Sequence, residues 1–210
     1  MTKEKIKVLN LYAGIGGNRK LWPDDEVEVT AVENNVEIAA IYQDFFPQDK
    51  MIITDAHQYL LKHYSEYDFI WSSPPCPTHS RMRTLKNNCE ETVKKYPDMK
   101  LYEEIIYLKH FFKGKWVVEN VISYYEPLIK PFPSENHYFW SNFNISKRNP
   151  INRGIRRHGD THNNDKWGFN LNEINLPNRL KNKILNNLCH PNLGLHVFNC
   201  AFKTRQERLI

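Results

Sequence analysis

The fold is decided by residues 5–18, which read KIKVLNLYAGIGGN. The apolar, β-branched run from Lys5 to Leu11 is typical of a buried strand, and it ends in a turn that holds three glycines. We expect a strand-to-helix turn here, where glycine lets the backbone approach a ligand closely. A tight connection without any ligand has the same composition, so this stretch alone leaves both interpretations open.

The same rhythm of strand, turn and helix continues through the first 120 residues. Further strands are predicted at Val27–Val32, Met51–Thr54, Phe69–Trp71 and Trp116–Val118, with helices at Val36–Phe46, His57–Tyr64 and Asp98–Phe112. Several of the strand runs are almost continuously apolar, which is typical of parallel strands that are buried on both faces. Alternating strands and helices indicate an open α/β fold with right-handed crossovers, whose ligands bind beyond the carboxyl ends of the strands.

The rhythm stops after Val121. Prolines 127, 131 and 133 mark an irregular connection, and His137–Phe143 is predicted to be one further strand. The segment from Lys147 to Asn178 is rich in Asn, Arg, Gly and Asp, which predicts a loop-like module rather than a core element. The last stretch is predicted to be helical, with Leu193, Val197 and Phe198 on one face.

Length and composition exclude several classes of protein. The 210 residues suit one catalytic domain, and 40% hydrophobic with 25% charged residues is ordinary globular composition. No apolar run approaches the roughly 18 residues of a membrane span, so we expect a soluble cytoplasmic protein. The four cysteines include no C-x-x-C pair, which favours free thiols and no metal site: Cys76, Cys89, Cys189 and Cys200.

Positive charge is concentrated in one part of the chain. The formal net charge is +5, yet the segment from Lys147 to Lys183 holds nine Lys or Arg and three Asp or Glu, which is +6. A polyanion would therefore bind this segment. A solvated loop with no partner is the alternative.

Acidic residues end the second and third predicted strands. Glu33 is placed to accept hydrogen bonds from the two hydroxyls of a ribose, and Asp55 from an adenine amino group. Both could instead be ordinary solvated strand ends. Together with the glycine turn they suit an adenosine-bearing ligand, and the sequence has neither the G-x-G-x-x-G of dinucleotide sites nor a Walker lysine.

The fourth predicted strand leads into SSPPCPTHS at residues 72–80. Prolines on both sides of Cys76 stiffen the loop and hold the thiol at a fixed place. A nucleophilic cysteine needs an electropositive surrounding, which His79, Arg81 and Arg83 could supply. The alternatives are a buried structural cysteine and, with His79, half of a metal site.

The fifth predicted strand ends in Glu119-Asn120-Val121, next to the same sheet edge. A half-buried glutamate can keep or share a proton, which suits a group that hydrogen-bonds a ring nitrogen. A cysteine and a glutamate at adjacent strand ends, beside an adenosine-type pocket, form a coherent chemical set.

These motifs, in this order, resemble the cytosine-C5 DNA methyltransferases. The glycine turn resembles the family's first motif, Glu33 and Asp55 the second and third, Ser73-Pro74-Pro75-Cys76 the fourth and Glu119-Asn120-Val121 the sixth. The stretch NNLCHP at residues 186–191 resembles the tenth more loosely. In its amino-acid sequence the chain most resembles short members of the family from phage and low-GC bacterial genomes.

The resemblance implies a Rossmann-like class I fold dependent on S-adenosylmethionine, with a mostly parallel sheet. It implies double-stranded DNA with a flipped cytosine as partner, Cys76 as nucleophile and Glu119 as the group that binds the base. The implied cofactor contacts are Tyr12, Ala13, Gly14, Ile15, Gly16, Gly17, Glu33, Asn34, Asp55, Ala56, Pro74, Leu101 and Asn187. The implied DNA contacts are Ser80, Arg81, Arg83, Asn120, His137, Arg153, Arg156 and Arg157, with Lys166 and Trp167 as further candidates.

The expected organisation is a catalytic core at 1–146, a basic recognition segment at 147–182 and a C-terminal helix at 183–210 that completes the core. So short a recognition segment suggests a partner protein or a second copy of the chain. Pro77 stands where the family usually has Gln, and the eighth-motif stretch PSENHY at 133–138 has no arginine, so His137 or an arginine of 153–157 would substitute. A tRNA cytosine methyltransferase and a non-catalytic DNA-binding protein are the alternative functions.

Overall fold

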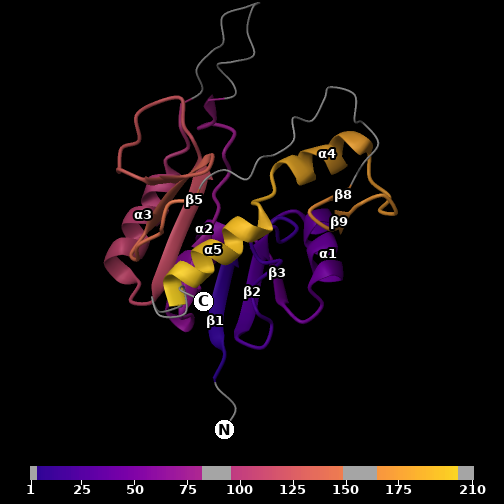
Figure 1. The fold of residues 1–210 in the computed structure, drawn as a ribbon, viewed down its shortest axis with the longest axis horizontal. Helices are drawn as coiled ribbons and strands as arrows, with labels where there is room; N and C mark the ends of the chain where they lie inside the picture. The colour runs from indigo at the N-terminus through magenta and orange to yellow at the C-terminus, as the bar shows by residue number, and fades with distance from the viewer. Residues whose placement is uncertain (1–3, 82–95, 149–164, 203–210) are drawn as a thin grey trace, which may run out of the picture.

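A seven-stranded sheet forms the centre of the computed structural model, which describes residues 4–81, 96–148 and 165–202 (Figure 1). The strand order is β3-β2-β1-β4-β5-β7-β6. The parallel strands are β1 (Ile6–Leu11), β2 (Val27–Glu33), β3 (Lys50–Ile53), β4 (Phe69–Ser72) and β5 (Lys115–Val121). The predictions placed all five within a few residues of these bounds.

The other two strands close the sheet beside β5. β7 (His137–Ser141) runs antiparallel to β5, with Val121 opposite His137, and β6 (Phe132–Ser134) pairs with β7. Because β7 is antiparallel, it begins at the edge where β5 ends. A mostly parallel sheet with one reversed strand confirms the expected α/β class, although β6 was not predicted.

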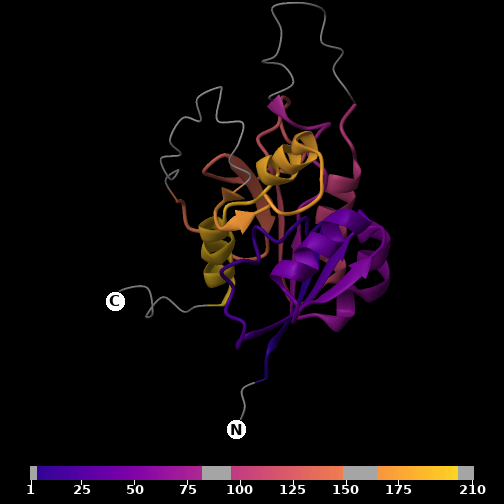
Figure 2. The same ribbon diagram turned by 90° about the vertical axis from the view of Figure 1, so that its right-hand side faces the viewer.

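Helices cover both faces of the sheet and make three layers (Figures 1 and 2). On one face lie α2 (Ala56–His63) and α3 (Lys100–Phe111), packed on alternate strand residues such as Leu9, Leu11 and Ile70. On the other lie α1 (Val36–Phe45) and α5 (Pro191–Phe202). In α5 the residues Leu193, Val197 and Phe198 are fully buried, which confirms the predicted face.

The turn after β1 does not lead into a helix, so that part of the prediction is wrong. Residues 12–26 are all described and form successive turns, with bonds from Gly16 N to Ala13 O, Arg19 N to Gly16 O and Trp22 N to Arg19 O. Glycine and asparagine favour turns over helix, and Gly14 and Gly16 have positive φ. The helix α5 packs against this segment: a Cβ on Gly194 would lie 2.2 Å from Asn18 O.

The segment after residue 165 contributes to the core, which corrects the prediction of a loop-like module for residues 147–178. The strands β8 (Asp165–Lys166) and β9 (Phe169–Asn170) form a hairpin, and Phe169 and Leu171 are fully buried against α1. The helix α4 (Asn178–Asn186) follows, and the expected boundary between residues 182 and 183 falls inside it. The sequence did not reveal that Phe169 and Leu171 are buried, because in this segment single aromatic or aliphatic residues stand between polar ones.

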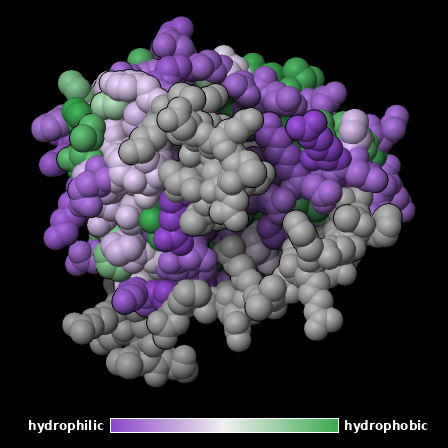
Figure 3. Space-filling model, turned by 90° about the horizontal axis from the view of Figure 1, so that it is seen from above, coloured by the Kyte–Doolittle hydropathy of each residue, from purple (hydrophilic) through white to green (hydrophobic). Residues whose placement is uncertain are grey.

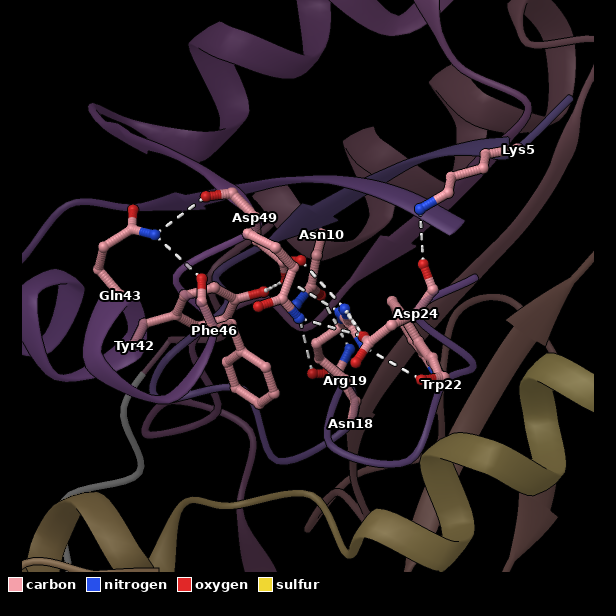
Figure 4. Close-up of polar contacts among 11 residues, drawn as sticks. Lys5, Asn10, Asn18, Arg19, Trp22, Asp24, Tyr42, Gln43, Phe46 and Asp49 are labelled. Carbon is pink, nitrogen blue, oxygen red and sulfur yellow. Dashed lines mark hydrogen bonds and ion pairs between the residues drawn. The ribbon is translucent and has the colours of Figure 1, made fainter. Parts of the chain in front are cut away.

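A buried ionic cluster joins the turn segment to α1 and to the start of β3 (Figure 4). The guanidinium of Arg19, which is 1% exposed, donates to both carboxylate oxygens of Asp49, at 2.9 and 3.0 Å. It also bonds Asp24, while the hydroxyl of Tyr42 donates to Asp49 at 2.7 Å. Arg19 further lies over the ring of Phe46, 5.2 Å from its centroid. This cluster stabilises the part of the chain that follows the glycine turn in the sequence.

Within the described ranges, no helix combines the length and the apolar character that crossing a membrane requires.

Candidate active site

The predicted site residues meet at the carboxyl edge of the sheet, where ligands bind in such folds. Figure 3 looks onto this edge, and the described surface there is mostly hydrophilic with scattered hydrophobic residues. The glycine turn, Asp55 and the Cys76 loop follow β1, β3 and β4, while Glu33 is the last residue of β2 and Glu119 lies near the end of β5.

At the glycine turn one position is open and two are closely packed. A Cβ at Gly14 would meet nothing within 4 Å, and its φ is +55°. In contrast, a Cβ at Gly16 would lie 2.3 Å from the ring of Phe46, and one at Gly17 would lie 2.4 Å from Cys189 O. Gly14 therefore leaves backbone accessible to a ligand, whereas Gly16 and Gly17 allow α1 and the segment after α4 to pack.

Glu33 orders the turn with its carboxylate. Oε2 accepts from Gly14 N at 3.1 Å, and Oε1 accepts from the backbone N–H groups of Asn34 and Asn35, each at 3.0 Å. Its carboxylate is thus held at the strand end beside the open Gly14 position. One acceptor site of the four on a carboxylate remains for a ligand hydroxyl.

Asp55 has a local structural role. It is the N-cap of α2, and its Oδ1 accepts from Gln58 N at 2.8 Å. Capping of this kind typically stabilises a helix by about 1 kcal/mol. The residue is exposed.

The remaining predicted cofactor residues divide by burial. Ile15 is fully buried in the core, so in this structure it has no surface that a ligand could touch. Ala13, Ala56, Pro74 and Leu101 are also buried, and Asn34 and Asn187 are exposed. Asn187 is the C-cap of α4, in the segment that packs against Gly17.

The loop after β4 turns sharply at the cysteine. The carbonyl of Cys76 accepts from His79 N at 3.0 Å and from Ser80 N at 3.1 Å. Asn120 at the end of β5 donates to the carbonyl of Pro74 at 3.0 Å. The loop is thus tied to the neighbouring strand on the approach to the thiol.

The surroundings of Cys76 do not favour the thiolate in the free protein, contrary to the expected electropositive field. Burial raises the pKa of its thiol, and the nearby negative charge of Glu119 raises it further. Burial lowers the pKa of His79, which is 1% exposed and whose Nδ1 lies 2.7 Å from the hydroxyl of Tyr125. This shift favours the neutral form of His79, and Arg83 lies outside the described residues.

Glu119 is held between two side chains. The hydroxyl of Ser73 donates to its Oε2 at 2.9 Å, and Nε2 of His137 lies 3.7 Å from its Oε1. Ser73 in turn accepts from the indole of Trp71 at 2.8 Å. The Cys76 loop and the end of β5 are therefore joined through Ser73, and His137 stands beside Glu119 where the missing arginines of the eighth motif were expected.

A family model for C-5 cytosine-specific DNA methylase matches residues 6–124, more than half of the 210-residue chain. The match runs from β1 past Glu119. The chain belongs to this family. Membership confirms the resemblance drawn from the motifs.

Solved structures of low identity also match this chain. A SAM-dependent methyltransferase from Agrobacterium tumefaciens is 17% identical, with 59% of this chain and 41% of that one covered and a TM-score of 0.43. The PH0226 protein of Pyrococcus horikoshii is 17% identical (56% and 50% covered, TM-score 0.39). The methyltransferase EhMeth of Entamoeba histolytica is 13% identical (71% of this chain and 58% of that one covered, TM-score 0.42). No curated protein matches.

Several of the predicted DNA contacts lie outside the described residues, namely Arg83, Arg153, Arg156 and Arg157. Among the described contacts, Ser80 forms an isolated antiparallel β-bridge with Ser123, and Arg81 is exposed at the same edge. Lys166 instead donates to the carbonyl of Leu185 at 2.6 Å and lies over Trp167. In this structure Lys166 therefore holds the hairpin to α4.

Two residues of the site were missed from the sequence. Ser73 was quoted only as part of a motif, and Glu104 was not singled out at all. Glu104 is fully buried and bonds Tyr12, His57 and Ser72. The available signal was an acidic residue three positions after Leu101 on the buried face of α3.

Proposed function

We propose that this chain transfers a methyl group from S-adenosylmethionine to C5 of cytosine in DNA, with Cys76 as the nucleophile. The observation that carries the proposal is the join between the Cys76 loop and Glu119 through Ser73, at adjacent strand ends within the family match. Cytosine C5 becomes reactive only when a nucleophile adds at C6. A thiol and a glutamate set side by side suit that reaction.

The residues at the glycine turn fit the cofactor. Gly14 leaves open space at a positive φ, and the Glu33 carboxylate next to it can accept from a ribose hydroxyl. Asp55, exposed at the end of β3, would accept from the adenine amino group. When bound, S-adenosylmethionine supplies an electrophilic methyl group.

In the proposed chemistry the Cys76 thiolate forms a bond to C6, and the electron pair of the C5–C6 double bond makes C5 nucleophilic. Glu119 holds a proton at N3 of the ring, where negative charge develops. C5 takes the methyl group as its bond to the cofactor sulfur breaks, which leaves S-adenosylhomocysteine. Transfer of the C5 proton to water then restores the double bond, and the C6–S pair returns to Cys76. Because burial and Glu119 raise the pKa of the free thiol, the thiolate would form once the base sits against Glu119.

The partner in this proposal is double-stranded DNA. The target base must leave the helix, at a cost of a few kcal/mol, because C5 and C6 are not accessible within the stack. The basic segment, with Arg81, would neutralise phosphates around the opening. A partner protein or a second copy of the chain would extend this short recognition surface, and the reaction would take place in the cytoplasm.

A DNA duplex that carries 5-fluorocytosine tests the nucleophile. Fluorine cannot leave as a proton does, so the adduct stays on the protein when S-adenosylmethionine is present. Cys76→Ser should abolish the adduct and keep cofactor binding, while Cys189→Ser, another free thiol, should keep both. An adduct that maps by peptide mass to a different cysteine would refute the assignment.

Calorimetry with S-adenosylhomocysteine tests the cofactor site. Glu33→Ala should weaken binding strongly, whereas Glu37→Ala, an exposed residue in the first turn of α1, should not. Equal affinity in both variants would show that Glu33 does not bind the ribose. Methyl transfer to duplex DNA but not to tRNA would exclude the alternative RNA substrate.

A further inference from the structure

The site contains a fully buried carboxylate that the proposed reaction does not use. Glu104 lies on α3, 0% exposed, and reaches three side chains at the carboxyl edge of the sheet. Its Oε2 accepts from the hydroxyl of Ser72 at 2.6 Å. Its Oε1 accepts from the hydroxyl of Tyr12 at 2.6 Å and lies 3.2 Å from Nδ1 of His57.

Each of the three partners belongs to a different site segment. Tyr12 begins the glycine turn and has a φ of +55°. His57 is in the first turn of α2, two residues after Asp55, and Ser72 is the last residue of β4, immediately before the loop that carries Cys76. In the chain, Tyr12, His57 and Ser72 lie 92, 47 and 32 positions from Glu104.

In all three contacts the carboxylate of Glu104 is the acceptor, and the partner side chain is the donor. Burial and the charge of Glu104 raise the pKa of Tyr12 well above the usual range of a tyrosine, so its phenol keeps its proton. The hydrogen bond to Glu104 raises the pKa of His57, which favours the protonated ring. Buried hydrogen bonds to a charged group are short and strong, so they hold their partners in one place.

We propose that Glu104 is a positioning residue, which sets the glycine turn and the Cys76 loop at a fixed distance from one another for methyl transfer. This inference rests on the proposed function. Transfer needs the methyl group and the base in line, and a misplacement of about 1 Å can lower a rate about 100-fold. A carboxylate shared by Tyr12 and Ser72 removes that freedom.

The test is Glu104→Gln, which keeps the shape but replaces one acceptor oxygen by an NH₂ group that faces a donor. Two quantities are measured. One is the Kd of S-adenosylhomocysteine, and the other is the rate at which the 5-fluorocytosine adduct forms at saturating S-adenosylmethionine. We expect the Kd to rise about tenfold and the rate to fall about 100-fold. Glu103→Gln is the matched control, because Glu103 neighbours His57 at 3.7 Å but is exposed. It should stay within about twofold on both readouts.

A purely structural role would lower the melting temperature of Glu104→Gln and leave both quantities unchanged in the folded protein, which would overturn the proposal. Should that variant fail to fold, Tyr12→Phe and Ser72→Ala each remove one donor. Tyr12→Phe should then raise mainly the Kd, and Ser72→Ala should slow mainly adduct formation. Wild-type values in both would overturn the proposal. A wild-type protein that binds S-adenosylhomocysteine but forms no adduct would refute the proposed function, and the effect of Glu104→Gln on Kd would still decide the positioning role.

Discussion

Two buried polar clusters lie on either side of the glycine turn, and they differ in what they connect. The Arg19 cluster joins the chain behind the turn to Asp24 and Asp49, which lie just before β2 and β3, at the amino ends of those strands (Figure 4). The Glu104 cluster lies at the carboxyl ends. In a parallel sheet only the carboxyl ends border the ligand site.

The two clusters also differ in charge. Arg19 is matched by the buried carboxylate of Asp49 and the exposed one of Asp24. Among the described residues Glu104 contacts one side chain that can carry positive charge, His57, together with two hydroxyls. The first cluster is therefore expected to govern stability at all ordinary pH values, and the second to respond to pH and to affect the reaction.

The largest expected effect comes from breaking the Arg19 pair. Arg19→Leu leaves Asp49 buried without its cation, and we expect the free energy of unfolding to fall by about 3–5 kcal/mol, measured by urea denaturation. The double variant Arg19→Leu with Asp49→Leu removes both charges and should recover part of that loss. A single variant that loses less than about 1 kcal/mol would mean that the cluster does not stabilise the fold.

A smaller effect is expected from Tyr42→Phe, which removes the hydroxyl that donates to Asp49 at 2.7 Å. Loss of one buried hydrogen bond should lower the free energy of unfolding by about 1–2 kcal/mol, with no change in the Kd of S-adenosylhomocysteine. Tyr59→Phe, whose hydroxyl pairs with that of Tyr67, is the control for removal of a tyrosine hydroxyl. A change in cofactor Kd in Tyr42→Phe would contradict the division between the clusters.

The Glu104 cluster should make stability depend on pH through His57. Glu104 and Glu103 raise the pKa of His57, while burial and Lys100 oppose them. A raised folded pKa gives stability that is fully present below about 6.5, the unfolded value, and is lost as the pH rises through the folded pKa. The wild type should lose more stability than His57→Gln between pH 6 and pH 8.5 in urea titrations. Parallel curves for the two proteins would exclude this role.

The smallest expected effect concerns the thiol itself. Glu119→Gln removes the second cause of the raised Cys76 pKa and leaves burial, the first cause, in place. Alkylation of Cys76 by iodoacetamide at pH 8 should therefore become a few-fold faster, although methyl transfer becomes slower. Glu126→Gln, whose carboxylate is not among the causes of the shift, is the control. Slower alkylation in Glu119→Gln would show that its charge does not act on the thiol.

By itself the sequence determined the five parallel strands, because their burial depends on runs of apolar residues that are local in the chain. It also determined that Gly14, Glu33, Cys76 and Glu119 lie at one edge, since parallel strands end together. Only the tertiary structure decided how these residues are held: the turns in place of a helix after β1, the burial of Phe169 and Leu171, and the lowered pKa of His79. Glu104 shows the physical reason most clearly, because its bond to Tyr12 spans 92 positions and no local pattern encodes such a contact.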